Sequence, residues 1–153
     1  MRNNILRLLP IISCICMFTV LTACSFPTKI DTQVLVSFDT NPDANGRPSP
    51  LVIRIYELKS INIFNNSDFY NLYYDKEDTL GGDLLSRKEF ELSPGGGREI
   101  FHKASDQTRY LGVIAAYRNI DQARWRASTA LELNKKNSSI IKIGKQTVTI
   151  HKN

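Results

Sequence analysis

The chain has 153 residues, of which 42% are hydrophobic, and its formal net charge at pH 7 is +5. This length is typical of a single domain with a core of its own. The 20 lysines and arginines are dispersed along the sequence among 15 acidic residues. Because they form no basic stripe of the kind that follows a phosphate backbone, nucleic acid is not an expected partner.

The first 23 residues are predicted to be a cleaved secretory signal peptide. Arg2 and Arg7 give a positively charged start, and residues 8–23 are almost wholly apolar. This apolar run of 16 residues is short for a bilayer span, which needs about 20. The run ends in Leu21–Cys24, which resembles the bacterial lipobox, in which the chain is cleaved before the cysteine and the cysteine is acylated.

Cys24 is therefore the candidate lipidation site and would become residue one of a lipoprotein. Cys14 and Cys16 depart with the signal, so Cys24 is the only cysteine that would survive cleavage. The alternative is that these cysteines are small apolar residues of a membrane anchor or of a signal without lipid. Two or more acyl chains anchor a protein stably. The same resemblance implies the periplasmic face of the outer membrane, because Ser25 stands where an Asp would favour the inner membrane.

Residues 24–32 are expected to form the lipidated N-terminus and a short tether that lets the domain stand off the bilayer. A strand is predicted next, at Gln33–Asp39. In it Val34, Val36 and Phe38 alternate with other residues, which is the period of a strand with one buried face.

Residues 41–50, with the sequence NPDANGRPSP, are predicted to form an exposed loop stiffened by prolines. The loop is long for a hairpin connection, and long loops on rigid sheets often carry recognition. A mere long turn remains the alternative. The opening of the loop, Asn41–Gly46, also matches the start of a calcium-binding loop. However, Val52 stands where such a site needs a bidentate Glu, and no predicted helices flank the loop. Calcium is therefore not expected.

Leu51–Leu58 is rich in branched and aromatic residues and is predicted to be a central strand, able to pair with the first. Apolar spacings of three and four residues then predict two short helices within about residues 60–75, with Ser60 and Ser67 as N-caps. Four acidic residues follow and are expected to form a solvated linker, since their spacing matches no metal site: Asp75, Glu77, Asp78 and Asp83.

The remaining sequence predicts six more strands, at Leu85–Leu92, Glu99–Lys103, Tyr110–Tyr117, Arg124–Leu133, Ile140–Ile143 and Gln146–Ile150. Ser93–Gly97 is predicted to be a hairpin turn, and the last two strands to form a hairpin. Eight strands with one helical insertion predict an all-β fold, a two-sheet β-sandwich over residues 33–152, without fixing its topology.

Six pieces of sequence, spread along the chain, stand in an order and spacing that together are specific. They are the lipobox, NPDANGRPSPLVIRIYEL at Asn41–Leu58, DFYNLYYD at Asp68–Asp75, LGGDLL at Leu80–Leu85, SPGG at Ser93–Gly96 and YLGVIAAYRNIDQARWRA at Tyr110–Ala127. In these pieces the chain resembles the outer-membrane lipoproteins of the type VI secretion system, the TssJ family (also SciN or VasD).

The resemblance implies a sandwich of transthyretin-like character that is not an enzyme. It also implies binding to the periplasmic C-terminal domain of TssM, an inner-membrane protein, which would tether the secretion complex to the outer membrane. The contact would be the loop between the first two strands, that is Asn41, Pro42, Asp43, Ala44, Asn45, Gly46, Arg47 and Pro48.

Two other functions stay open. A pilotin-like lipoprotein of another secretion machine would escort an outer-membrane secretin instead of binding a TssM domain. A periplasmic hydrolase on a transthyretin-like fold would need catalytic side chains, yet His102 and His151 lie in no catalytic signature and follow strand alternation. We expect both at the surface or at a sheet edge, and we expect no cofactor, metal or small-molecule substrate.

Overall fold

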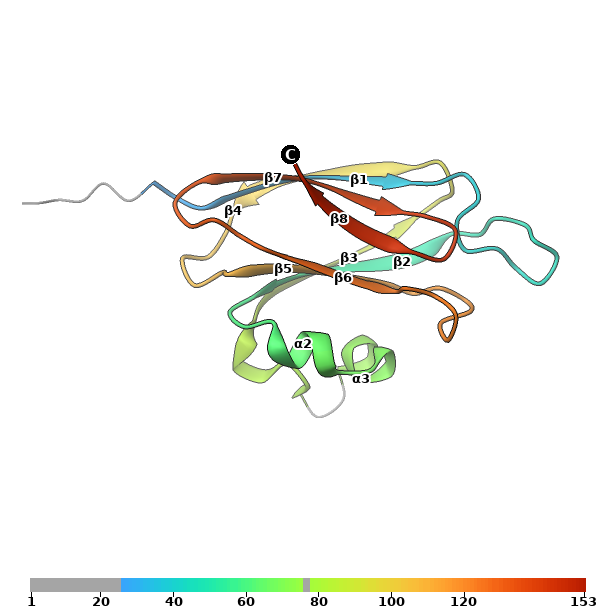
Figure 1. The fold of residues 1–153 in the computed structure, drawn as a ribbon, viewed down its shortest axis with the longest axis horizontal. Helices are drawn as coiled ribbons and strands as arrows, with labels where there is room; N and C mark the ends of the chain where they lie inside the picture. The colour runs from blue at the N-terminus through green and yellow to red at the C-terminus, as the bar shows by residue number, and fades with distance from the viewer. Residues whose placement is uncertain (1–25, 76–77) are drawn as a thin grey trace, which may run out of the picture.

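The computed structural model describes residues 26–75 and 78–153. Two four-stranded sheets pack face to face, and two short helices cover the outer side of one of them (Figure 1). The predicted all-β sandwich with a helical insertion is confirmed.

The two sheets are called sheet A, in the order β4-β1-β7-β8, and sheet B, in the order β3-β2-β5-β6. The strands of sheet A are β1 Lys29–Val36, β4 Gly97–Lys103, β7 Lys136–Ile143 and β8 Val148–Lys152. Those of sheet B are β2 Leu51–Leu58, β3 Leu84–Leu92, β5 Tyr110–Ala115 and β6 Arg126–Ala130. β1 and β7 run parallel, whereas the other neighbouring pairs are antiparallel.

The core lies between the sheets, where Val34 and Ile141 of sheet A meet Ile53 and Val113 of sheet B, all 0% exposed. β2 has the predicted bounds and lies in the middle of sheet B, between β3 and β5. Its other face is covered by the helical insertion, which explains why the strand is apolar on both faces.

The predicted position and pairing of the first strand were wrong. β1 begins at Lys29, so residues 29–32, expected in the tether, belong to the sheet. The buried face includes Thr32, whose hydroxyl bonds the Ser139 hydroxyl at 2.8 Å, and this polar residue hides the alternation in the sequence. β1 pairs with β4 and β7 rather than with β2, because the segment after it crosses to the other sheet.

The two predicted hairpins differ in outcome. The last one is confirmed, since Ile141 pairs with Ile150 and Ile143 with Val148 in β7 and β8. The reversal at residues 93–97 exists, but it joins β3 of sheet B to β4 of sheet A, so it is a crossing between sheets and not a hairpin. A turn signal shows where the chain reverses, whereas the partner of each strand depends on contacts far along the sequence.

The helical insertion comprises α2 Asn62–Asn66, α3 Phe69–Tyr74 and a 3-10 turn at Gly81–Asp83. Phe64 of α2 is fully buried against sheet B, and a Cβ placed on Gly112 of β5 would lie 2.8 Å from its ring. The glycine therefore allows the close approach of helix and sheet.

The predicted N-caps of these helices were wrong. The N-cap of α3 is Asp68, whose carboxylate accepts the Asn71 N–H at 2.8 Å. Ser67 instead ends α2 and donates its hydroxyl to the Ile63 carbonyl at 2.8 Å. The N-cap of α2 is Ile61, whose side chain makes no cap bond, although the hydroxyl of the preceding Ser60 accepts the Asn62 N–H at 3.4 Å. Because only two residues separate α2 from α3, Ser67 is the C-cap of α2 and Asp68 is the N-cap of α3.

Two arginines of sheet B bind carbonyls of the helical insertion. Arg126 of β6 donates to the Phe64 carbonyl at 2.6 Å and to the Ser67 carbonyl at 2.7 Å. Arg54 of β2 donates to the Tyr73 carbonyl and lies over the Tyr73 ring, 4.2 Å from its centroid. The insertion is thus fixed to the sheet by hydrogen bonds as well as by apolar packing.

We predict that Ile114→Asn destabilises the domain strongly. Ile114 is 0% exposed and packs against the helical insertion, so the change removes apolar packing, at about 2–5 kcal/mol, and buries an amide without partners, at about 1–3 kcal/mol. Urea unfolding measures the loss. Phe101→Asn is the control, because Phe101 is 66% exposed and its change should cost less than about 1 kcal/mol. Equal losses would contradict the burial of Ile114.

Candidate functional site

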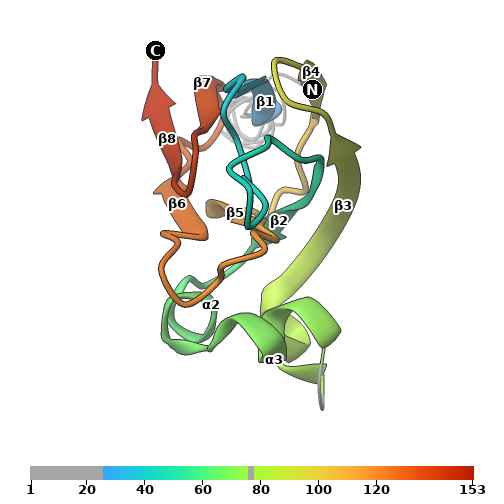
Figure 2. The ribbon, with the colours of Figure 1, turned by 90° about the vertical axis from the view of Figure 1, so that its right-hand side faces the viewer.

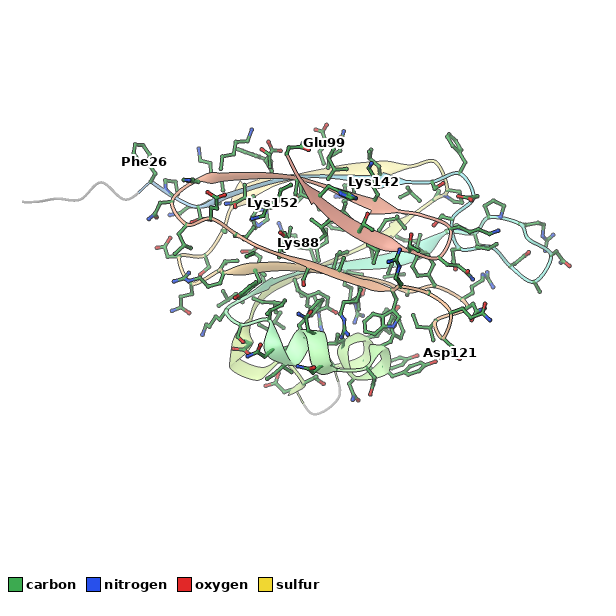
Figure 3. The ribbon with its side chains drawn as sticks, viewed as in Figure 1. Phe26, Lys88, Glu99, Asp121, Lys142 and Lys152 are labelled. Atoms are coloured by element: carbon green, nitrogen blue, oxygen red, sulfur yellow. The ribbon has the colours of Figure 1, made fainter. Side chains whose placement is uncertain are left out.

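The candidate site lies at one end of the sandwich, here called the distal end. Residues 37–50, which join β1 to β2, gather there with three other connections, residues 93–96, 116–125 and 144–147 (Figure 1). Phe26 lies at the opposite, proximal end (Figure 3). Figure 2 shows the molecule with the distal end toward the viewer, and the β1–β2 segment lies at its centre.

Asn41 anchors the base of the loop. It is 3% exposed, and its N–H donates to the Lys145 carbonyl at 3.0 Å. Its side-chain amide donates to the Pro50 carbonyl at 2.8 Å and accepts the Arg118 N–H at 2.8 Å. Asn41 has φ of 49°, a left-handed conformation that asparagine tolerates better than most residues. The Asn41 side chain thus closes the base of the loop and ties it to the β5–β6 connection, while its backbone N–H ties it to the β7–β8 turn.

Thr40 adds a second anchor at the same place. It is 0% exposed, and its hydroxyl donates to the Gly144 carbonyl at 2.8 Å. The Tyr117 hydroxyl reaches the same turn, donating to the Thr147 carbonyl at 2.8 Å. Burial raises the pKa of Tyr117 well above its ordinary value. The β7–β8 turn is therefore a fixed platform for the loop.

The tip of the loop is organised around Asp43. One of its carboxylate oxygens accepts the N–H groups of Asn45 and Arg47 at 2.8 and 2.9 Å, and the other accepts two guanidinium N–H groups of Arg47, both at 2.8 Å. Gly46 supplies the turn, with φ of 76°. The hydrogen bond from the Arg47 backbone is the largest cause that lowers the pKa of Asp43. The tip is therefore ordered before any partner binds.

These bonds also bear on the calcium alternative. Both carboxylate oxygens of Asp43 and the side-chain oxygen of Asn41 are engaged within the protein. A hard cation needs several free oxygens that converge, and the loop offers none from these two residues. Over residues 26–75 and 78–153, three or more metal-binding side chains gather nowhere.

The eight predicted contact residues divide into two groups. Asn41 is buried and Pro42 and Asp43 are half-buried, so these three support the loop. The other five are exposed: Ala44, Asn45, Gly46, Arg47 and Pro48. The Arg47 side chain is 75% exposed and that of Asp43 only 18%, so Arg47 is the charge that the loop displays.

Phe38 is a site residue that the sequence interpretation missed. We expected it on the buried face of the first strand, but β1 ends at Val36 and Phe38 is 82% exposed. Its ring lies over Gly95 of the β3–β4 connection, 2.3 Å from where a Cβ would stand. The turn formers from Asp39 onward were the available signal that the strand had already ended.

A shallow hollow lies beside the loop at the distal end. Its lining comes from the loop, from the connection between β5 and β6 and from the β7–β8 turn: Pro42, Asp43, Ala44, Arg118, Asn119 and Gln146. The exposed loop tip, Phe38 and this hollow all belong to the connections of the distal end.

The histidines lie away from this site. His102 is half-buried on edge strand β4, and its Nε2 lies 2.6 Å from a Glu57 carboxylate oxygen, which joins sheet A to sheet B. The Thr108 hydroxyl donates to the other oxygen at 3.1 Å. His151, on edge strand β8, contacts the Thr149 hydroxyl at 3.0 Å. The edge positions are confirmed, although the His102 ring turns inward.

Some predicted features lie outside the described residues. They are the lipobox with Cys24, Ser25 and the acidic Glu77. Asp75, from the same acidic group, contacts Arg87 at 3.1 Å. In the part of the chain that the structure describes, no helix has the length and apolar character needed to cross a bilayer.

Comparison with known families decides the identity of the domain. The family described as "Type VI secretion lipoprotein, VasD, EvfM, TssJ, VC_A0113" matches residues 28–151, a range that includes the loop and nearly all of the eight strands. The chain belongs to this type VI secretion lipoprotein family. The resemblance seen in the sequence is thereby confirmed.

Solved structures similar to this chain support the family assignment. TssJ1 of Pseudomonas aeruginosa is 36% identical, with a TM-score of 0.80 over 83% of this chain and 97% of that one. Serratia marcescens Lip, a membrane-bound component of the type VI secretion system, is 28% identical, with a TM-score of 0.75 over 83% and 98%. A chain of a type VI membrane complex is 26% identical, with a TM-score of 0.72 over 82% and 98%. No curated protein sequence matches the chain.

Family membership also bears on the two alternatives left open by the sequence. A type VI secretion lipoprotein is a component of that machine rather than a pilotin of another one. The family is described as a secretion lipoprotein and not by an enzymatic activity.

We predict that the tip of the loop loosens in acid. Because the pKa of Asp43 lies below its usual value of 3.8 in the folded protein, the ionised carboxylate stabilises the loop above that pH. This contribution is lost as the pH falls through the folded pKa. NMR titration of the Asn45 and Arg47 amide shifts should give a common midpoint below 3.8. The Asp43→Asn variant should lack the transition, and a wild-type midpoint at or above 3.8 would contradict the network.

Proposed function

We propose that this type VI secretion lipoprotein is anchored in the outer membrane by acyl chains on Cys24 and binds the periplasmic C-terminal domain of TssM through residues 41–48. It would thereby tether the membrane complex of the secretion system to the outer membrane. The observation that carries this proposal is that the N-terminal Phe26 and the loop lie at opposite ends of the domain.

The proposed domain organisation follows from the sequence and from where β1 begins. Residues 1–23 would be cleaved as a signal peptide, leaving Cys24 as the first residue. Thr28 is already buried, and its carbonyl accepts the Ala104 N–H at 2.9 Å. The four steps along the backbone from Cys24 to Thr28 reach at most about 14 Å. The tether is therefore shorter than the sequence suggested, and the proximal end is held near the bilayer.

β1 then carries the chain from the proximal to the distal end. Its eight residues extend about 26 Å at the rise of a β-strand. The loop that follows is thus presented away from the membrane, toward the periplasm. A lipoprotein that must reach an inner-membrane partner needs its contact surface on this side.

The chemistry of the distal end favours a protein contact. Prolines, the Asp43 network and the Asn41 anchor restrict the loop beforehand, so less conformational entropy is lost on binding. The exposed surface displays Phe38 and Arg47, residue types that often contribute much of the binding energy at interfaces. The relative found in a type VI membrane complex supports a place in such an assembly.

We predict that replacing Asp43–Arg47 by a Gly-Ser segment of equal length weakens binding to the TssM domain at least tenfold, which is about 1.4 kcal/mol. The change removes the displayed Arg47 and the network that orders the tip. Melting should change little, because the anchors Thr40 and Asn41 remain. Isothermal titration of lipid-free protein against the TssM domain measures the affinity.

A matched pair of phenylalanines serves as control for this prediction. Phe38 and Phe101 are both exposed, at 82% and 66%, but Phe101 lies on β4, away from the loop. Phe38→Ala should weaken binding, whereas Phe101→Ala should leave it unchanged. If the folded loop variant bound as tightly as the wild type, the complex would form on another face of the sandwich.

A further inference from the structure

Three lysines lie side by side at the proximal end of sheet A. In the register of the sheet, Lys29 of β1 is directly opposite Lys103 of β4 on one side and Lys136 of β7 on the other. All three are exposed. Residues paired in this way point to the same face of a sheet, with Cβ atoms only about 5 Å apart. We call this set the lysine row.

Only one lysine of the row has an ion-pair partner among the residues that the structure describes. Lys136 contacts the Asp31 carboxylate at 2.6 Å. Over residues 26–75 and 78–153, Lys29 and Lys103 form no ion pair. Like charges directly opposite each other destabilise a sheet, so the row lowers the stability of the folded domain. An anionic partner outside the domain would relieve that repulsion.

The surroundings of the row contain both signs of charge. Lys135 of the connection between β6 and β7 contacts Glu132 at 2.7 Å. Arg109 and Asp106 of the connection between β4 and β5 are both exposed. Among these eight residues, that is the three lysines of the row with Lys135, Arg109, Asp31, Asp106 and Glu132, five are basic and three are acidic, so the excess positive charge of the group equals two.

The row lies where the chain enters the domain. The Thr28 carbonyl accepts the Ala104 N–H and the Thr28 hydroxyl accepts the Asn134 N–H, both at 2.9 Å. These bonds fix the entry point between the β4–β5 and β6–β7 connections. Thr28 immediately precedes Lys29 and is the fourth residue after Cys24.

An exposed aromatic ring stands between the row and the proposed lipid. Phe26 is 75% exposed and projects at the proximal end (Figure 3). Leu133, next to the Asn134 that contacts Thr28, is 41% exposed. Aromatic side chains beside basic ones are typical of surfaces that meet the interface of a bilayer.

We infer that Phe26 and the lysine row dock against anionic phospholipid headgroups of the membrane that holds Cys24. This inference rests on the proposed acylation of Cys24, and it adds a second contact with the membrane. Lipid is favoured over a protein partner because a reach of at most about 14 Å from the acylated residue keeps the row beside headgroups. The acyl chains fix where the protein is, and the docked row fixes the orientation in which the distal loop is presented.

The test is lysine acetylation of the mature lipoprotein in vesicles of phosphatidylethanolamine, with or without phosphatidylglycerol, read by mass spectrometry. Lys29 and Lys103 should react about fivefold more slowly when phosphatidylglycerol is present, and high salt should abolish the difference. Lys145, which is exposed at the distal end, should react equally in both. Equal rates for Lys29 and Lys103 in the two kinds of vesicle would overturn the inference.

Two double variants test whether the protection depends on the lysine row or only on the net charge of the protein. In both, the acetylation rate of Lys136 is measured with and without phosphatidylglycerol. Lys29→Gln with Lys103→Gln should abolish the protection of Lys136 by phosphatidylglycerol. Lys142→Gln with Lys145→Gln removes the same charge from exposed positions farther along the domain and should preserve it. Equal protection of Lys136 in the two variants would contradict docking through the row.

The same sample separates this inference from the function proposed above. The mass of the N-terminal peptide shows whether Cys24 carries acyl chains. An unacylated Cys24 would overturn the anchor and the docking together. An acylated Cys24 without protection of the row would overturn the docking alone.

Discussion

The structure depends on β1, which is held between an antiparallel neighbour, β4, and a parallel one, β7. Strands paired on both sides are fixed along their whole length, so β1 determines where the chain enters the domain and where the next loop leaves it. Its inward residues, such as Val34 at 0% exposure, belong to the core between the sheets. Entry point and loop are therefore parts of one rigid body.

Hydrogen bonds of polar side chains fix the parts of the structure that the apolar core does not hold. Asn41 fixes the loop to the β5–β6 connection, Asp43 orders its tip, and Glu57 joins the sheets through His102. The bonds of Asn41 and Glu57 link segments that the apolar packing brings together, whereas those of Asp43 act within the loop tip. Buried or half-buried polar groups that are fully bonded restrict the structure to one arrangement. The loop thus keeps its shape without contributing to the core.

Features encoded by local pattern could be predicted from the sequence, whereas those set by distant contacts could not. The bounds of β2 and the pairing of Ile141 with Ile150 follow from apolar periodicity and a nearby turn. Thr32 conceals the start of β1, because its hydroxyl is satisfied by a residue of β7 that the sequence does not place beside it. The loop was recognisable from its prolines, but the position of the Phe38 ring over Gly95 involves another connection that the sequence does not place beside it.

The claim that anchor and loop lie at opposite ends is tested most directly by measuring heights above the membrane. In the mature lipoprotein with Cys24 acylated, an introduced cysteine would be the sole free thiol. A fluorophore can therefore be attached at Arg47→Cys in the loop, or at Gln107→Cys, an exposed position of the proximal connection between β4 and β5. Energy transfer to acceptor lipids should place the label at position 47 farther from the bilayer by about 26 Å, the length of β1. Equal heights would contradict the account.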